Sequence, residues 1–548
     1  KNIKIFDPAC GSGNFLIIAY KELRRLEMEI FKEMGSLALS EISLSQFYGI
    51  ELDDFAHEIA ILALWLTKHQ MNVEFFKEFG RTNPTLPLTD AGNIVQGNAC
   101  RLDWEEVCPK GEKDEIYILG NPPYIGRRNQ NKSQKSDIID ALGGIKNHRS
   151  LDYIAVWFFK GSTYIKDVRA SLAFVSTNSI CQGEQVALFW PNILNDNLNI
   201  HFAHQSFKWI NNAKNNAGVS VVIIGLTSLK VPFKYIFKEN LKIVAKNINP
   251  YLVNSRNIYV YNRTSSISGL QQMKYGNLPG GCTELFLMPD EKKYLISKYP
   301  QINDFIRKLV GSQESINDIE KYCLWFKGLS LSNPIFKINE IKEKIEKITK
   351  NRTSSKDKSY NELRDRPHQF RDLNETTTNS IVLPIVSSER REYLPTSFVD
   401  SFCIVPNSAQ VIYDAESWMF GVVSSKMHMS WLKSIGGKLE TRFRYSKNLV
   451  YNTFPFPSIS KQRKEELTQC TLKIIDERLK HSEKTLAQLY DPDKMPEGLK
   501  EAHHQNDLAV ERCYRSIPFS SDEERLEYLF KLYEKMIQEE KDKDTLFA

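Results

Sequence analysis

The sequence lacks the paired cysteines of a disulfide framework or a zinc ribbon. Its nine cysteines are scattered singly, with no Cys-x-x-Cys motif among them, and this pattern is typical of a reducing cytoplasm. It also lacks a visible signal peptide and any apolar run long enough to span a membrane. These absences argue against a secreted disulfide scaffold and a membrane-spanning protein, and they predict a cytoplasmic location.

A strong excess of charge of one sign is missing as well. The chain has 73 Lys and Arg against 67 Asp and Glu, which gives a net charge of +6. Such a mild excess permits a polyanionic partner, but a solvated surface explains it equally well. The length of 548 residues predicts two to four domains, and an apolar fraction of 41% is enough to give them buried cores.

The first 230 residues contain a regular alternation of strands and helices. Amphipathic stretches at residues 14–34 and 53–70 predict helices between short apolar segments. The predicted strands cover residues 3–6, 47–50, 94–97, 116–119, 172–176 and 219–226. This alternation predicts an α/β domain with a mostly parallel sheet covered on both faces, in which ligands bind beyond the carboxyl ends of the strands.

The remaining sequence divides into two regions. Residues 231–458 have frequent turns and short strands, with a charged helix predicted at 338–350 and a solvated loop at 351–358. Residues 459–548 predict helices with solvated faces rich in Lys and Glu. Because the sequence opens directly on a predicted central strand, we expect a further part of the protein upstream.

The first predicted strand runs into a glycine turn with the sequence DPACGSG at residues 7–13. Gly11 and Gly13 allow the backbone to turn tightly and to approach a ligand closely. The turn has no P-loop lysine, which argues against a nucleoside triphosphate. Asp7, at the end of the strand, suits pairing with a cationic amino-acid moiety.

Two further strand ends carry polar side chains. Glu51 ends the second predicted strand and suits the hydroxyls of a ribose, whereas Asn98 follows the third and can hydrogen-bond the edge of an adenine ring. Both residues have structural alternatives, because Glu51 can cap the next helix and Asn98 can stabilise a turn. Three such residues in order, each at a strand end, favour a ligand site.

The catalytic hypothesis rests on Asn121, Pro122, Pro123 and Tyr124, directly after the fourth predicted strand. An exocyclic amine conjugated to a purine ring is a poor nucleophile. The Asn121 side-chain carbonyl and the Pro122 backbone carbonyl can accept its two hydrogens while it attacks a methyl sulfonium, and no metal is required. The prolines preorganise both acceptors, and Tyr124 offers a ring on which an extruded base can stack. A plain Pro-Pro turn is the alternative.

DPACGSG followed by NPPY resembles the motifs of the class I amino-methyltransferases. Their order, with the recognition region last, resembles the gamma class of adenine-N6 DNA methyltransferases. A closer resemblance is to the MmeI-like family of combined (type IIG/IIL) restriction–modification enzymes. It rests on FDPACGSGNFL, GIELDDFA, NPPYIGRRNQNKSQKSD, VSSERREYLP, RFRYSKNLVYNTFPFP and YDPDKMPEGLKEAHHQND, which lie in all three regions.

This resemblance implies a class I S-adenosylmethionine-dependent methyltransferase with a Rossmann-like mixed sheet at residues 1–230. An α+β target recognition domain at 231–458 and a helical C-terminal domain at 459–548 would follow. The implied activity is methylation of adenine N6 in double-stranded DNA of a prokaryote, in a sequence-specific manner. The N-terminal nuclease and linking helical domain of the family are not represented, and residues 289–292 predict a turn and helix start rather than a nuclease motif.

The resemblance also assigns residues to the cofactor and to the target base. The cofactor group is Asp7, Ala9, Cys10, Gly11, Gly13, Glu51, Leu52, Asn98 and Ala99. The target-adenine group is Asn121, Pro122, Pro123 and Tyr124. A second aromatic ring is expected to clamp the base. Phe207 and Trp209, which precede residues 211–218, are the candidates, and packing in a core is the alternative.

Two sets of residues are expected to contact DNA. Arg127, Arg128, Lys132 and Lys135 follow the catalytic motif and suit phosphate contacts, although a solvated loop explains them equally well. Glu389, Arg390 and Arg391 form a second candidate cluster.

The segment at residues 436–446 alternates like a single strand, so Glu440 and Arg442 are predicted to share one face. Arginine can grip guanine O6 and N7, and glutamate can accept from cytosine N4, so the pair can read one G·C base pair. The family resemblance supports this assignment. A surface salt bridge is the alternative.

Two other functions stay open from the sequence. The first is methylation of an RNA base or a protein glutamine, since NPPY serves those targets too, but the long region after residue 230 argues against it. The second is a DNA-specificity subunit that binds without catalysis. The intact motifs at residues 7–13 and 121–124 argue against that function.

Overall fold

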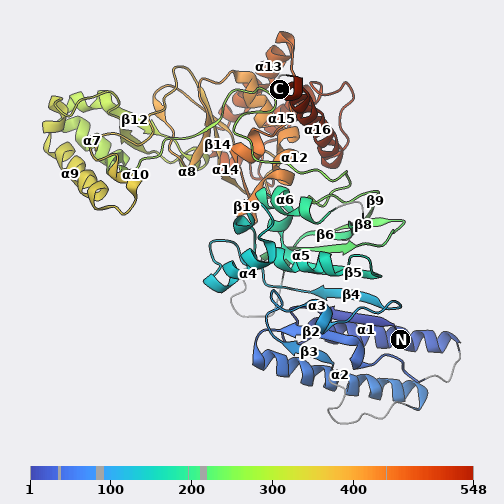
Figure 1. Cartoon of the computed structure of the whole chain (residues 1–548). Helices are drawn as coiled ribbons and strands as arrows, with labels where there is room; N and C mark the ends of the chain where they lie inside the picture. Colours follow the sequence, from blue (N-terminus) through green and yellow to red (C-terminus); the bar gives the residue numbers. More distant parts are fainter. Residues whose placement is uncertain are drawn as a thin grey trace. The chain divides into compact units, whose positions relative to one another are not determined.

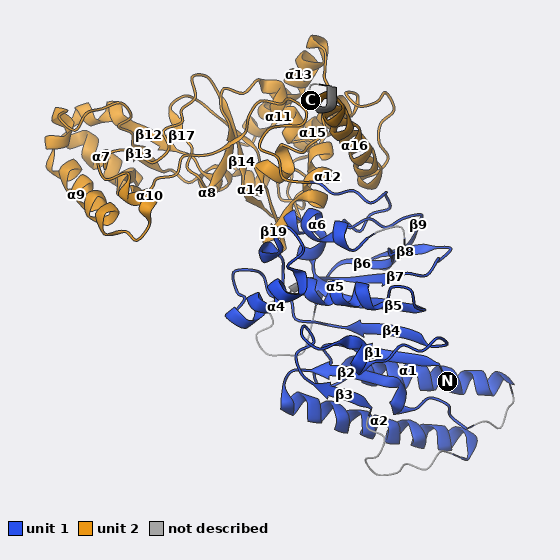
Figure 2. Cartoon of the chain, viewed as in Figure 1, with its two compact units in different colours: residues 1–260 blue, residues 261–548 orange. Residues whose placement is uncertain are grey.

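The computed structural model describes residues 2–34, 39–81, 92–194, 197–209, 219–439 and 441–546. The chain forms two compact units, Lys1–Val260 and Tyr261–Ala548 (Figures 1 and 2). Within the described ranges, no helix is both long enough and apolar enough to cross a membrane.

A nine-stranded sheet in the order β3-β2-β1-β4-β5-β7-β6-β8-β9 organises the first unit. Its parallel part consists of β3 (Asn93–Gln96), β2 (Phe47–Glu51), β1 (Ile3–Asp7), β4 (Glu115–Gly120) and β5 (Ala170–Thr177). The mixed part consists of β7 (Val219–Thr227), β6 (Asn199–Trp209), β8 (Lys234–Lys238) and β9 (Leu241–Ala245). The predicted alternation of strands and helices is confirmed, and the order of the strands reverses between β1 and β4.

Helices cover the two faces of this sheet, and β1 shows how the sequence directs them. Neighbouring side chains of a strand point to opposite faces. Ile5 packs in a buried cluster with α1 (Asn14–Met34) and α2 (Asp54–Phe79). Phe6 lies on the other face, with its ring centroid 5.4 Å from that of Trp104 in α3 (Trp104–Val107). It is 6.0 Å from the ring of Tyr164 in α5 (Ala155–Tyr164).

Three strands of this sheet were not predicted. The strand β6 shifts register between Ile200 and Phe202 and again between His204 and Phe207, which breaks the two-residue period on which a strand prediction depends. The strands β8 and β9 extend the sheet beyond residue 230, and the first compact unit runs to Val260. The division into three domains stays a prediction.

Three small sheets and two groups of helices make up the second unit. The first sheet holds β10 (Lys274–Tyr275), β18 (Ala409–Ile412), β14 (Ser380–Pro384) and β16 (Ser397–Val399). The second holds β11 (Phe286–Leu287), β13 (Tyr322–Leu324), β12 (Ile306–Leu309) and β17 (Cys403–Ile404). The third holds β15 (Val386–Ser387), β20 (Arg442–Arg444) and β19 (Gly437–Leu439). The helix α7 (Pro289–Lys298) begins where the sequence predicts a helix start.

The C-terminal region is helical, as predicted. It contains α13 (Lys461–Leu479), α14 (Leu486–Leu489), α15 (Glu497–Glu511) and α16 (Asp522–Leu546). Two helices from before residue 458, α11 (Ser417–Val423) and α12 (Lys426–Ile435), pack among them. The Trp431 ring of α12, for example, lies 5.5 Å from the Phe530 ring and 5.8 Å from the Tyr533 ring of α16.

The predicted loop at residues 351–358 is wrong at its start. The helix α9 (Asn339–Ser354) continues through Arg352, which is fully buried. Among the backbone carbonyl groups that accept from its guanidinium, four lie within 2.9 Å, those of Gly280 (2.9 Å), Leu363 (2.9 Å), Arg366 (2.8 Å) and Gln369 (2.8 Å). The helix extends because this arginine ties its end to two separate segments of the chain.

Replacing Arg352 by methionine should destabilise the second unit. The four carbonyl groups would lose their buried donor, at a cost of about 3 kcal/mol or more. Urea unfolding should show a lower midpoint for Arg352→Met, whereas Lys350→Ala, at an exposed position of the same helix, should leave it unchanged. Equal midpoints for both variants would contradict the structural role of Arg352.

Candidate active site

The predicted site residues follow the carboxyl ends of β1, β2, β3 and β4. The order of strands reverses between β1 and β4, and such a switch point opens a crevice in which α/β proteins bind ligands. The two strand ends lie close together, because a Cβ atom on Gly120 would stand 2.5 Å from Oδ1 of Asp7. The structure thus brings the residue before Asn121 into contact with the predicted cofactor carboxylate.

Asp7 is fully buried, and its two carboxylate oxygens differ. Oδ1 accepts a hydrogen bond from the Ala9 amide at 3.0 Å, whereas Oδ2 has no partner in the described structure. Burial raises the pKa of Asp7 to about 7, and the negative charge of Glu51 adds to this effect. A buried acceptor without a donor is costly, so Oδ2 fits a cationic ligand group.

The glycine turn has the geometry that the sequence predicts. Gly11 and Gly13 adopt positive φ angles of 54° and 83°. The Gly11 amide donates to Oε2 of Glu51 at 2.7 Å, and a Cβ atom on Gly11 would meet no atom within 4 Å. Glu51 therefore fixes the loop through the Gly11 amide, and the space where a Gly11 side chain would lie is empty. A backbone that approaches a ligand closely needs both features.

Glu51 does not cap the following helix. Asp53 caps α2 by accepting from the Ala56 amide at 2.9 Å, whereas Oε1 of Glu51 accepts from the Asp53 amide at 2.9 Å. The capping alternative for Glu51 is therefore wrong. Leu52, beside it, is 68% exposed at the same edge of the sheet.

The Asn98 side chain does stabilise a turn. Its Oδ1 accepts from the Cys100 amide at 2.9 Å, and its Nδ2 donates to Oδ2 of Asp137 at 3.1 Å. Asp137 lies on α4 (Lys132–Leu142) and also accepts from Tyr153 and Arg101, each at 2.8 Å. This buried carboxylate was not predicted, because 39 residues separate it from Asn98. The ligand role of Asn98 stays a prediction, as does that of Ala99, which is buried.

The predicted catalytic motif follows β4, and its side-chain acceptor makes no described hydrogen bond. Oδ1 of Asn121 is buried and has no hydrogen-bond partner in the described structure. Pro122 is buried, Pro123 is exposed and Tyr124 is half-buried. Burial raises the pKa of Tyr124, and a hydrogen bond with the Asn121 side chain acts in the opposite direction. The motif therefore offers a neutral aromatic ring beside a free carbonyl acceptor.

The basic residues after the motif are exposed. These are Arg127, Arg128, Lys132 and Lys135. Phe207 lies on β6 with 36% of its surface exposed, which does not fit core packing, and its ring is 6.4 Å from that of Trp209. Residues 211–218 lie outside the described ranges.

In the second unit, strand pairing joins the two segments predicted to contact DNA. The strand β15 pairs with β20 through Val386 opposite Arg444, and β20 pairs with β19 through Leu439 opposite Arg442. The prediction of one strand across residues 436–446 is wrong, since the segment forms a hairpin. Glu440 lies outside the described residues.

Side chains around this three-stranded sheet differ in exposure. Arg442 and Arg444 are exposed on β20, and Phe443 between them is buried, as alternation requires. Glu389 is exposed just after β15, and Arg391 is half-buried. Arg390 forms an ion pair with Asp493.

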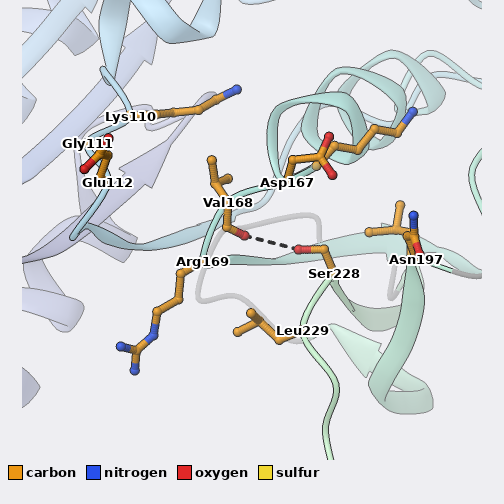
Figure 3. Close-up of a pocket in the computed structure, with 11 residues that line it drawn as sticks. Lys110, Gly111, Glu112, Asp167, Val168, Arg169, Asn197, Ser228 and Leu229 are labelled. Atoms are coloured by element: carbon orange, nitrogen blue, oxygen red, sulfur yellow. Dashed lines mark hydrogen bonds between the residues drawn. The ribbon is translucent and has the colours of Figure 1, made fainter.

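A cavity of about 990 Å³ in the first unit lies at the opposite edge of the sheet. It is lined by Lys110, Gly111, Glu112, Lys166, Asp167, Val168, Arg169, Asn197, Leu198, Ser228 and Leu229 (Figure 3). These residues precede β4, β5 and β6 or follow β7, and Ser228 donates to the Val168 carbonyl at 3.2 Å. The cavity contains none of the predicted site residues.

Comparison with known proteins agrees with this geometry. A solved structure of MmeI, a type IIL restriction–modification enzyme in complex with DNA, is 37% identical to the chain. It is matched over 98% of this chain and 73% of its own length, with a TM-score of 0.86. The chain belongs to the MmeI family. The predicted family and fold class are thereby confirmed.

Family descriptions of three MmeI domains cover most of the chain. Residues 1–238 match the DNA-methyltransferase domain, 254–458 the target recognition domain and 459–539 the C-terminal domain. DNA methyltransferase A of Bacillus subtilis (strain 168) is 47% identical over 547 residues, which are 98% of this chain and 62% of that protein. The chain thus spans less than two thirds of the length of this MmeI-family relative.

Replacing Gly120 by alanine should distort the site. The new Cβ atom would clash with Asp7, so we expect a loss of about 1–3 kcal/mol in the free energy of unfolding. Gly126→Ala is the matched control, because its Cβ atom would meet nothing within 4 Å. Thermal unfolding should show a lower Tm for Gly120→Ala alone. An unchanged Tm for both would contradict the close approach of β1 and β4.

Proposed function

We propose that the chain is the methyltransferase and recognition part of a restriction–modification enzyme that methylates adenine N6 in double-stranded DNA. The observation that carries this proposal is the buried, unpartnered Oδ1 of Asn121 at the switch point of the sheet. Membership of the MmeI family supports it, since a solved structure of MmeI is a complex with DNA. The protein would act in the cytoplasm of a prokaryote, on the DNA there.

The groups at the carboxyl ends of β1, β2 and β4 suit S-adenosylmethionine. The unpartnered Oδ2 of Asp7 would accept from its ammonium group, and the open backbone at Gly11 would admit its amino-acid end. Glu51 would bind the ribose, with Leu52 beside it, and Asn98 would accept from the adenine through the second lone pair of Oδ1. When bound, the cofactor supplies an electrophilic methyl group.

The catalytic motif would then activate the target amine. Oδ1 of Asn121 and the Pro122 carbonyl accept one hydrogen bond each from the N6 hydrogens, which raises the electron density on nitrogen. The amine nitrogen would then take the methyl group that the cofactor supplies, with the neutral thioether as leaving group, and the proton lost from nitrogen would pass to water. Tyr124 stacks on the extruded base, and Phe207, exposed at the end of β6, is the second candidate ring.

Recognition of the DNA sequence is assigned to the second unit. Residues 254–458 match the target recognition domain of MmeI. Glu389 and Arg391 follow β15, which pairs with β20, the strand that carries Arg442. These segments would therefore contact neighbouring bases. Glu440, which lies outside the described residues, would read a base together with Arg442. Arg127 and Arg128 would contact phosphates.

The role of Asn121 predicts a selective loss of catalysis. Asn121→Ala removes one preorganised acceptor, so methyl transfer should fall at least about 100-fold while DNA binding changes little. Single-molecule sequencing of host DNA after expression should show N6-methyladenine at one motif with the wild type and none with the variant. Loss of DNA binding by the variant would contradict the role. A folded wild type that modifies RNA or protein, but not DNA, would contradict the proposed substrate.

The raised pKa of Asp7, about 7, predicts that cofactor affinity depends on pH. The carboxylate can pair with an ammonium group only when ionised, so affinity should rise from pH 6 to pH 8 by about tenfold and level off above. Calorimetric titration with S-adenosylhomocysteine, which keeps the ammonium group, would measure it. Asp7→Asn should bind more weakly and lose this dependence. A flat wild-type profile would contradict the pairing.

A further inference from the structure

The residue directly after the catalytic motif is held on both sides by buried side chains. The Ile125 amide donates to Oδ1 of Asp152 at 2.9 Å, and the Ile125 carbonyl accepts from Nε2 of Gln130 at 2.8 Å. Asp152 is 6% exposed and Gln130 is 4% exposed. Burying an ionisable and an amide side chain is unfavourable unless their hydrogen bonds are made. The bonds to Ile125 therefore stabilise both buried side chains and fix the backbone on each side of this residue.

Asp152 joins the catalytic loop to two neighbouring elements. Its Oδ1 also accepts from the Ile154 amide at 3.3 Å, at the start of α5. Its Oδ2 lies 3.5 Å from the hydroxyl of Ser179, which follows β5. The carboxylate therefore links the loop after β4 to the end of the adjacent strand. Burial raises the pKa of Asp152, and the backbone amides that donate to it act in the opposite direction.

Gln130 closes the turn that carries the phosphate-contact candidates. Its Nε2 donates to the Leu151 carbonyl at 3.1 Å as well as to Ile125. The intervening turn is closed by the Asn129 amide, which donates to the Gly126 carbonyl at 2.8 Å. The turn presents the exposed side chains of Arg127 and Arg128. Ile125 is thus a fixed point between this turn and the catalytic motif.

The predicted catalytic acceptor needs such a fixed point. Oδ1 of Asn121 makes no described hydrogen bond, so its position depends on the backbone that carries Asn121 and on the hydrogen bond between the Asn121 side chain and Tyr124. Upstream, Gly120 is fixed by its pairing with Phe174 of β5 and by its contact with Asp7. Downstream, Pro122 and Pro123 have no amide hydrogen to donate. Ile125 is therefore where side-chain hydrogen bonds anchor the motif.

We propose that Asp152 and Gln130 are positioning residues for methyl transfer. They fix Ile125, so that a phosphate contact at Arg127 or Arg128 keeps the target base aligned with the catalytic motif. The inference rests on the proposed function. Neither residue touches the reacting atoms. Their loss should therefore reduce the rate of transfer from a bound complex and leave the affinities for DNA and cofactor nearly intact.

The test compares the full chain with three variants. Asp152→Ala and Gln130→Met each remove one anchor, whereas Asp152→Asn keeps an oxygen that can accept from the Ile125 amide. The measurements are single-turnover transfer to a duplex, the Kd for DNA, and the fluorescence of 2-aminopurine at the target position, which reports extrusion of the base. Wild-type transfer tests the proposed function, and the variants, each relative to wild type, test the anchors.

Misplacement by about an ångström should slow transfer about 10- to 100-fold for Asp152→Ala and Gln130→Met. The Kd for DNA should change by less than about threefold, since both variants keep Arg127, Arg128 and the hydrogen bond from the Asn129 amide to the Gly126 carbonyl within their turn. Asp152→Asn should recover most of the rate, and 2-aminopurine should be less fully extruded in the two slow variants. If Asp152→Ala does not fold, Gln130→Met carries the test.

Three results would overturn the inference. The first is wild-type transfer by folded Gln130→Met. The second is transfer by Asp152→Asn that is as slow as that by Asp152→Ala, which would show that charge or stability, rather than the Ile125 hydrogen bond, is what matters. The third is loss of DNA affinity in proportion to loss of rate.

Discussion

The close approach of β1 and β4 is the constraint on which the site depends. Asp7 is buried where Gly120 leaves room for its carboxylate, and any side chain at residue 120 would collide with it. This contact places the first motif and the catalytic motif at one switch point of the sheet, although more than a hundred residues separate them. It also leaves two buried oxygens, Oδ2 of Asp7 and Oδ1 of Asn121, without partners. A cation and an amine are the groups that would satisfy them, and methyl transfer from S-adenosylmethionine to adenine brings both.

The pairing of β15 with β20 is a second contact that brings predicted site residues together. The three-stranded sheet of the second unit brings residues 386–387 against 443–444, so two polar segments far apart in the sequence form one surface. Phe443 is buried beneath it and Arg442 and Arg444 are exposed above it. Both groups of residues are therefore assembled in the same way, by strands that bring together segments far apart in the sequence. The difference is that the unpartnered oxygens of Asp7 and Asn121 are buried, whereas the side chains of Arg442 and Arg444 are exposed.

The sequence predicted those parts of the fold whose signal is local. Short apolar segments followed by motifs predicted β1 to β5. The positions directly at the strand ends predicted the site residues Asp7, Glu51, Asn98 and Asn121. The strand β6 was missed because two register shifts break its alternation, and the hairpin at residues 437–444 was missed because alternation continues across the turn. Asp137, Asp152 and Gln130 carry no local signal, since each acquires its role from a partner that only folding supplies. The continuation of α9 through Arg352 was not predicted either, because the carbonyl groups that bind this arginine come from other segments of the chain.

The most direct test of the account is a structure of the chain with S-adenosylhomocysteine and a duplex that contains its target motif. The cofactor is expected beyond the carboxyl ends of β1 and β4, with its ammonium group on Asp7, and an extruded adenine is expected with N6 within hydrogen-bond distance of Oδ1 of Asn121. A target adenine that stays stacked in the duplex, or a cofactor at the opposite edge of the sheet, would contradict it.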